Sequence, residues 1–341
     1  MVRIGLFDEG GLLALPNLAI ARLAGYWQRQ GAEVVYNRLG QRYDRAYVSG
    51  IFPAHWPQLQ TTMACLDTTQ IIVGGPGYAL ATAQPAPWPT LPVEVEAAEP
   101  DFAFWPDWPW SLGYSYRGCP RGCAFCVVPQ LEGRQVRRVA GSYWDLLRPE
   151  ARVAPRGQHL VDLAPNILAA PEAELAALWR EVRELGLTVD YSQGLDVRFI
   201  TQAVAEELAT LPIYVRWRDR FGRWQQRRRL YLALDWSALL PQFEQAARWL
   251  LGAGVKPSSV YVYILERPGE EADALARVQT VAQLKMRPYV MPLHDYQDDG
   301  LRRWVNRRYY QFVPLAQYRR RRSRRQMRLP LAEPGAVATG G

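Results

Sequence analysis

The stretch Arg117-Gly118-Cys119-Pro120-Arg121-Gly122-Cys123-Ala124-Phe125-Cys126 decides how this chain is interpreted. It sets three cysteines at C-x3-C-x2-C spacing, and the only other cysteine, Cys65, lies more than fifty residues upstream. Three thiolates can hold three irons of a cubane cluster and leave the fourth iron open, whereas ordinary electron-transfer clusters take four cysteines. We therefore expect a 4Fe–4S cluster on Cys119, Cys123 and Cys126, with one iron free to bind a substrate or cofactor.

Two other uses of these thiols fit the sequence less well. A structural zinc site takes four ligands, usually as paired C-x2-C or Cys/His units. No second pair follows the motif, and the histidines at positions 55, 159 and 294 are remote in sequence. A disulfide would leave an odd thiol and needs an oxidising compartment. A zinc or other structural site remains the alternative, and Cys65 is expected to be a small buried residue.

The spacing, the Phe before the third cysteine and the preceding Arg-Gly resemble the radical S-adenosylmethionine (SAM) superfamily. The resemblance implies that the amino and carboxylate groups of SAM chelate the open iron. It implies that the reduced cluster cleaves SAM to a 5′-deoxyadenosyl radical, which abstracts hydrogen from a substrate. It also implies a reducing electron donor such as ferredoxin or flavodoxin.

Further motifs resemble a bacterial and archaeal radical-SAM group with a cobalamin-binding-like N-terminal domain. More distantly, the order of domains resembles that of the tRNA methylthiotransferases. The matching segments are Cys126-Val127-Val128-Pro129, Glu132-Gly133, Asn166-Ile167-Leu168-Ala169, Gln193-Gly194-Leu195-Asp196-Val197-Arg198, Val290-Met291-Pro292 and Arg303-Trp304-Val305-Asn306-Arg307-Arg308-Tyr309-Tyr310.

Hydrophobic patterning predicts an α/β protein built from two parts. Strand patterns at residues 2–7, 33–36, 45–49 and 70–73 and a helical pattern at 17–30 predict a small parallel α/β, Rossmann-like domain over residues 1–80. The resemblance implies that this domain is cobalamin-binding-like. A Pro- and Trp-rich connector follows at 81–110, and its aromatic end is expected to pack rather than to form a binding edge.

The second part, residues 111–318, alternates strand and helix patterns. Six predicted strands and an amphipathic helix at 171–185 suggest a partial (β/α)6 barrel, with its site at the carboxyl ends of the strands. The resemblance implies that this is a radical-SAM barrel. An Arg-rich tail over residues 319–341 is expected to be flexible. The six strands are expected at 112–116, 159–163, 188–192, 229–234, 260–265 and 288–292.

The resemblance assigns candidate SAM contacts to residues that follow the barrel strands. Phe125 is placed near the adenine, Asn166 near the SAM amino group, and Asp235 near the ribose hydroxyls. Gln193 follows the third strand and joins them as a candidate.

Asp196 and Arg198 also follow the third strand. Their roles can be interpreted in two ways. The Arg198 guanidinium could pair with the SAM carboxylate, a role that suits its planar fork of donors. The two side chains could instead form a buried structural salt bridge.

The N-terminal sequence gives little support for cobalamin. The His-bearing loop Asp-x-His-x-x-Gly is missing, and Asp8-Glu9-Gly10-Gly11 stands in the corresponding position. This argues against cobalamin, although a base-off cobalamin needs no protein histidine.

A polar cluster follows the sixth strand. His294, Asp295, Asp298 and Asp299 could serve as acid/base groups or substrate ligands, or could form a solvated loop.

The net charge of +8 over 341 residues is concentrated in two stretches. Residues 216–229 and 319–328 hold seven Arg each, and the rest of the chain carries about −5. The first stretch interleaves Arg with aromatic residues, a pattern that suits phosphate contacts and base stacking. The second could add a sequence-independent grip on a polyanion or be a solvated tail. We therefore expect nucleic acid as a possible partner.

Composition indicates a cytoplasmic enzyme without a membrane partner. No apolar stretch reaches the length of a membrane span, no signal peptide is recognised, and cysteine usage is low. The sequence thus predicts a radical-SAM enzyme with an unidentified substrate, RNA being one candidate. Two alternatives stay open: modification of a peptide or small metabolite, and a nucleic-acid-binding protein with a structural iron–sulfur or zinc site.

Overall fold

The computed structural model describes residues 1–8, 15–84, 91–293 and 300–326, with side chains up to residue 320. The chain is α/β, as predicted, and contains several parallel sheets. It divides into two compact units, one of residues 1–199 and 210–230 and one of residues 200–209 and 231–341. The domain boundaries proposed from the sequence remain predictions.

The first sheet of unit 1 is four-stranded, with the order β2-β1-β3-β4 and parallel pairing throughout. Its strands lie within one or two residues of the predicted positions, because each alternating apolar run is short and clearly bounded. The strands are β1 (Arg3–Asp8), β2 (Glu33–Tyr36), β3 (Arg45–Ser49) and β4 (Ile71–Gly74).

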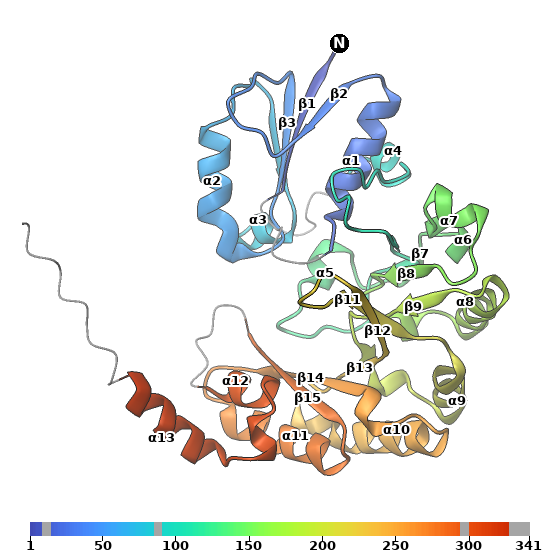
Figure 1. Cartoon of the computed structure of the whole chain (residues 1–341), viewed down its shortest axis with the longest axis vertical. Coiled ribbons are helices and arrows are strands. Elements are labelled where there is room, and N and C mark those ends of the chain that lie inside the picture. The colour runs from blue at the N-terminus through green and yellow to red at the C-terminus, as the bar shows by residue number, and fades with distance from the viewer. Residues whose placement is uncertain (9–14, 85–90, 294–299, 327–341) are drawn as a thin grey trace, which may run out of the picture. The chain divides into compact units, whose positions relative to one another are not determined.

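Helices cover both faces of this sheet. Ile4 and Leu6 point to one face and pack against α1 (Leu18–Arg29), while Phe7 points to the other and shares a core with Leu59 of α2 (Trp56–Ala64). Figure 1 shows α1 and α2 on opposite sides of β1 and β3. This division follows from the two-residue period of a strand, which sends successive side chains to opposite faces.

The second sheet of unit 1 is parallel and three-stranded, with the order β5-β8-β9. It consists of β5 (Ser111–Gly113), β8 (His159–Asp162) and β9 (Thr188–Asp190). Helix α8 (Glu172–Leu185) connects β8 to β9 and ends at Gly186, whose left-handed φ of 64° suits a helix C-cap. Its buried face includes Leu175, Leu178, Trp179 and Val182, which agrees with the amphipathic helix predicted at 171–185.

The aromatic end of the connector packs into the core of this sheet. Trp108 and Trp110 are buried together with Leu112 and Val161, which agrees with the packing interpretation. The remaining helices and strands of unit 1 are short. They are α3 (Pro76–Ala81), α4 (Val93–Glu96), β6 (Tyr116–Arg117), α5 (Val128–Leu131), β7 (Arg137–Arg138), α6 (Tyr143–Leu146), α7 (Pro149–Val153), β10 (Leu195–Asp196), β11 (Tyr214–Arg218) and β12 (Trp224–Arg228).

Unit 2 contains the last three predicted strands and the helices that pack with them. Strands β14 (Val260–Glu266) and β15 (Arg287–Pro292) pair in parallel, and β13 (Leu230–Ala233) neighbours β14. The fully buried Arg277 donates to the carbonyls of Leu234 and Leu265, which tie the ends of β13 and β14 together. The helices are α9 (Gln202–Thr210), α10 (Leu240–Gly252), α11 (Glu271–Gln283), α12 (Leu301–Asn306) and α13 (Leu315–Gln326).

Several sequence predictions concern residues at the edges of the described ranges. The polar cluster at 294–299 and the loop residues Glu9, Gly10 and Gly11 lie outside the described residues, as do residues 327–341 of the Arg-rich tail. The first part of that tail is helical, since α13 runs to Gln326. Cys65 was expected to be buried, and this is wrong: it is exposed because it caps the C-terminus of α2.

Candidate iron–sulfur and cofactor site

The loop that carries the three cysteines is fixed at its start by a buried carboxylate. Glu132 accepts a hydrogen bond from the Gly118 N–H at 2.9 Å and pairs with Arg117 at 3.3 Å. Burial raises the pKa of Glu132, and these two partners oppose that rise. The Cys119 N–H donates to the Gly133 carbonyl, so the motif Glu132-Gly133 anchors the first cysteine.

The pairing of β6 with β7 closes the base of the same loop. The three thiols are half-buried and free of disulfides, and the Cys126 N–H donates to the Cys123 carbonyl in a tight turn. Within the ranges that the structure describes, no group of three or more His, Cys, Asp or Glu side chains lies close enough to hold a metal ion. Assignment of a cluster to Cys119, Cys123 and Cys126 therefore remains a prediction from their spacing.

Asn166 lies directly beside the first cysteine of the loop. Its Nδ2 is 3.5 Å from Cys119 Sγ and 3.2 Å from an Asp196 carboxylate oxygen. The residue is only 5% exposed, and its Oδ1 is buried without a hydrogen-bond partner among the described residues. A buried acceptor left unpaired costs about 1–3 kcal/mol. The position is thus suited to a ligand that donates a hydrogen bond.

Asp196 contacts several polar side chains of this region. Arg198 donates to its two oxygens at 2.7 and 2.8 Å, and the Arg121 guanidinium lies 3.4 Å away. The predicted ion pair between Asp196 and Arg198 is therefore present. Burial lowers the pKa of Arg198, but hydrogen bonds to Asp196 and to Cys123 outweigh it and raise the pKa.

Arg198 thus has both Asp196 and the Cys loop as neighbours. The loop residue Arg121 also stacks over Phe199, 4.6 Å from the ring centroid. Arg121 was not predicted as a partner of Asp196, although its place inside the cysteine motif indicated a position near the thiols.

The other three candidate residues lie in different segments of the chain. Phe125 is half-buried within the Cys loop, and Gln193 is exposed in the turn after β9. Asp235 belongs to unit 2, where its backbone carbonyl accepts from Arg267 at 3.2 Å. The structure therefore brings together Asn166, Asp196 and Arg198 with the cysteines. Within the part of the chain that it describes, it shows no side-chain hydrogen bond of Gln193.

A buried hydrogen-bond network at the carboxyl ends of β5, β8 and β9 was not predicted. Asp162, the last residue of β8, accepts from the Ser115 hydroxyl at 2.5 Å and from the Tyr143 hydroxyl at 2.9 Å. Tyr143 also contacts the Tyr191 hydroxyl at 2.9 Å. Burial raises the pKa of Asp162, and its hydrogen bonds oppose that rise. The network fixes the strand ends that precede the Cys loop, Asn166 and Gln193.

No protein-family model matches this chain, and neither does any curated protein sequence. Among the described residues, no helix combines the length and the apolar character needed to cross a membrane.

Proposed function

We propose that this chain is a radical-SAM enzyme whose Cys119, Cys123 and Cys126 hold a site-differentiated 4Fe–4S cluster. The observation that carries the proposal is the position of Asn166, whose unpaired, buried Oδ1 lies on a side chain in contact with Cys119. A cysteine motif of this spacing leaves one iron open. Asn166 Oδ1 is a buried acceptor without a hydrogen-bond partner among the described residues, and it belongs to a side chain beside Cys119, so it is available to a ligand of that iron.

The residues around the loop fit a ligand with an ammonium and a carboxylate group. Asn166 Oδ1 can accept from an ammonium, and its orientation is held by the bond from Nδ2 to Asp196. Arg198 and Arg121 supply two guanidinium groups on the same carboxylate. Arginine forks recognise carboxylates in bidentate fashion, so one of these cations can bind a second carboxylate.

When bound, the cluster and SAM would supply a 5′-deoxyadenosyl radical that takes hydrogen from the substrate. The part of the chain itself is to position the cofactor and to keep water away from it. The half-buried cysteines and the buried Asn166 and Asp196 suit that shielding role. A partial β/α barrel remains our proposal for the arrangement of the strands in residues 111–318, with ferredoxin or flavodoxin as electron donor.

Anaerobic reconstitution with iron and sulfide tests the cluster. The protein should retain about four irons and four sulfides and show thiolate-to-iron charge-transfer absorption. Cys123→Ala should lose this signal, whereas Cys65→Ala is the matched control because Cys65 is an exposed cysteine outside the motif. Stoichiometric zinc, with no iron retained under these conditions, would favour the structural-site alternative and overturn the proposal.

Cofactor cleavage is tested separately. With a strong one-electron reductant, the reconstituted protein should convert SAM to 5′-deoxyadenosine and methionine even without substrate. Chromatography coupled to mass spectrometry measures both products. A protein that holds four irons but releases neither product would show that the cluster is not a SAM-cleaving one.

A further inference from the structure

The Arg-rich stretch at 216–229 forms most of an antiparallel hairpin. Strands β11 and β12 pair from Tyr214 with Arg228 to Arg218 with Trp224. The turn is closed by Asp219, which accepts from the backbone N–H groups of Phe221 and Arg223. Sequence analysis identified the charge and the aromatic residues of this stretch but not its strands.

One face of the hairpin is occupied by contacts within unit 1. Side chains alternate between the two faces of a strand, and cross-strand partners share a face. Trp224 lies with its ring centroid 4.1 Å from that of Trp110, and Arg216 donates to the Thr188 hydroxyl at 3.2 Å. Arg218 on the same face pairs with Asp107 at 2.8 Å. These side chains attach the hairpin to its own unit.

The opposite face and the turn present aromatic rings together with cations. Trp217 is 36% exposed and Phe221 is 64% exposed. The guanidinium of Arg227 lies 5.9 Å from the Trp217 ring centroid, and those of Arg220 and Arg223 lie 4.7 and 5.1 Å from that of Phe221. All three of these Arg side chains belong to exposed residues.

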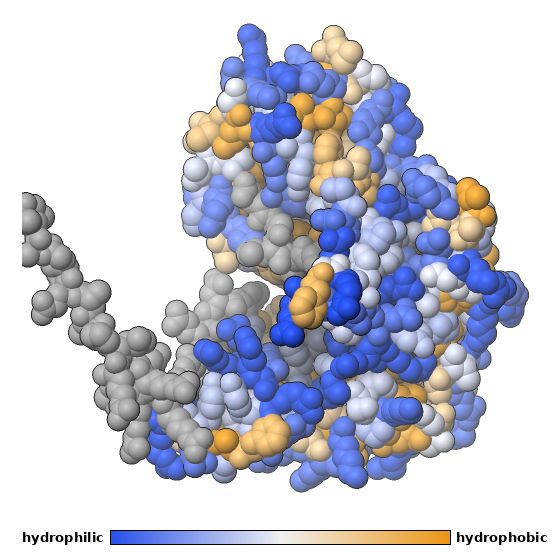
Figure 2. All heavy atoms as spheres, viewed as in Figure 1, coloured by the Kyte–Doolittle hydropathy of each residue, from blue (hydrophilic) through white to orange (hydrophobic). Residues whose placement is uncertain are grey.

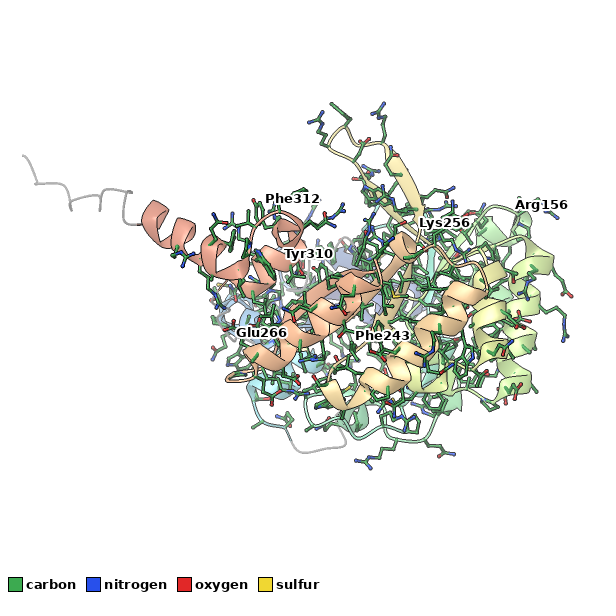
Figure 3. The ribbon with its side chains drawn as sticks, turned by 90° about the horizontal axis from the view of Figure 1, so that it is seen from below. Arg156, Phe243, Lys256, Glu266, Tyr310 and Phe312 are labelled. Carbon is green, nitrogen blue, oxygen red and sulfur yellow. The ribbon has the colours of Figure 1, made fainter. Side chains whose placement is uncertain are left out.

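Charged and polar side chains surround the turn of the hairpin. In Figure 3 the two-stranded hairpin projects with nitrogen-bearing side chains at its tip. Figure 2 shows a small hydrophobic area surrounded by strongly hydrophilic side chains near the centre of the visible face, close to the position of β11 in Figure 1. Burial raises the pKa of Asp219, the only acid of the stretch, but hydrogen bonds from Phe221, Arg223 and Gln225 together outweigh it and lower the pKa.

We propose that this outer face, made of Trp217, Arg220, Phe221, Arg223 and Arg227, binds single-stranded nucleic acid. Exposed rings can stack on unpaired bases, and arginines beside them can neutralise the flanking phosphates. A duplex hides its base faces, so the rings favour a single strand. The site binds through its own side chains and is independent of the cluster chemistry proposed above, although a bound strand would be a candidate substrate for it.

Binding of the full-length protein to a fluorescent ten-nucleotide oligouridylate tests the proposal, with oligothymidylate identifying whether RNA or DNA is preferred. Phe221→Ala and Trp217→Ala should each weaken binding by about 5- to 150-fold, the range for a base-stacking ring. Phe312→Ala is the matched control, because Phe312 is 79% exposed and lies outside the hairpin (Figure 3). It should bind as the unaltered protein does.

The charge contribution is tested with two triple variants that have the same net charge. The triple variant Arg220→Gln, Arg223→Gln, Arg227→Gln should lower the slope of log affinity against log salt by roughly 2, at about 0.7 per phosphate on a single strand. The matched triple variant changes three exposed arginines elsewhere in unit 1 to Gln, at Arg38, Arg42 and Arg156. It should leave the slope unchanged.

Three results would overturn the proposal. The first is no binding to either oligonucleotide at low salt. The second is an equal loss in the hairpin triple variant and its matched control, since the effect would then report net charge alone. The third is equal affinity for duplex and single strand with no effect of Phe221→Ala, which would leave a non-specific polyanion contact.

Discussion

The Asn166 side-chain amide donates to the Asp196 carboxylate across 3.2 Å, although thirty residues separate the two in sequence. The contact joins the loop after β8 to β10 and leaves the Asn166 carbonyl oxygen as a buried acceptor beside Cys119. The Asn166 side chain is thereby oriented by Asp196, and its carbonyl oxygen keeps the capacity to accept a hydrogen bond from a ligand.

Replacing Asn166 with Ala should weaken SAM binding more than cluster assembly. A hydrogen bond to a charged group is worth about 1.5–3 kcal/mol, so affinity should fall roughly 10- to 150-fold. Equilibrium dialysis of the reconstituted protein against labelled SAM measures the affinity. The iron content of the same preparation is the internal control and should stay unchanged. Unaltered affinity in the variant would show that Asn166 does not contact the cofactor.

Arg198 allows the structural and cofactor-binding interpretations to be separated. Arg198→Ala leaves Asp196 without its bidentate partner, and unfolding free energy should fall by about 1–3 kcal/mol because the Arg198 side chain is one-quarter exposed and partly screened. Denaturant titration measures this loss. Arg198→Lys keeps the charge but not the fork, so it should recover stability better than SAM affinity.

If Arg198→Ala destabilises the fold while SAM affinity stays intact, the ion pair with Asp196 is its whole role. A loss of SAM affinity in both variants, with stability restored in the lysine variant, would support a direct contact with the cofactor carboxylate.

The sequence predicted the regular elements well because their apolar periods are local. The strand at residues 33–36 and the strand at 45–49 lie where the alternation places them. The β11–β12 hairpin was missed because its alternating side chains are mostly Arg and Gln, so hydrophobicity carried no two-residue period. Its exposed glycine turn, at Gly222 with φ 74°, was the signal available.

The candidate site was predictable only in part. Asn166 was proposed because the resemblance places a polar residue after the second barrel strand, and Asp196 and Arg198 were proposed because they follow the third strand. The structure shows that these three side chains lie together, while their contact with SAM stays a prediction. The place of Arg121 inside the cysteine motif indicated a position near the thiols but not its contact with Asp196, and the contact of the Tyr143 hydroxyl with Asp162 depends on how a distant loop folds back onto the strand ends.

Asp190 should make stability depend on pH. This last residue of β9 is 8% exposed, its Oδ1 has no hydrogen-bond partner among the described residues, and burial raises its pKa to about 7 against the opposing charge of Arg229. Between its ordinary pKa near 4 and about 7, the folded state binds more protons than the unfolded state. The contribution of Asp190 to stability is therefore present at low pH and is lost as pH rises through this window.

Asp190→Asn removes this titrating carboxyl group, so the variant should not show the loss of stability with rising pH that Asp190 causes. The difference in unfolding free energy between the variant and the unaltered protein should shift in favour of the variant by roughly 2–3 kcal/mol from pH 5 to pH 7.5. Urea titrations at several pH values measure it. Glu150→Gln is the control for the change of net charge, because it removes a carboxylate whose side chain is 77% exposed. A constant difference for Asp190→Asn would mean that Asp190 titrates normally.

We expect a substitution of Gly118 to disrupt the Cys loop. Its φ is 83°, and a Cβ there would stand 2.1 Å from the Gln135 carbonyl oxygen, which is backbone and cannot move aside alone. Gly133 in the same loop has the same φ of 83° but no atom within 4 Å of the position of a Cβ. The two positions therefore share the cost of a left-handed backbone, about 1–2 kcal/mol, and differ only in the clash.

Gly133→Ala should lose about 1–2 kcal/mol of unfolding free energy and still take up iron. Gly118→Ala should lose more stability and most of its iron, because relieving the clash moves the backbone next to Cys119 and breaks the Gly118 N–H bond to Glu132. Denaturant titration and iron analysis of the two variants give the comparison. Equal losses in both would mean that the loop shifts to accept the Cβ, and that the anchoring of Gly118 by Glu132 does not set the position of the first cysteine.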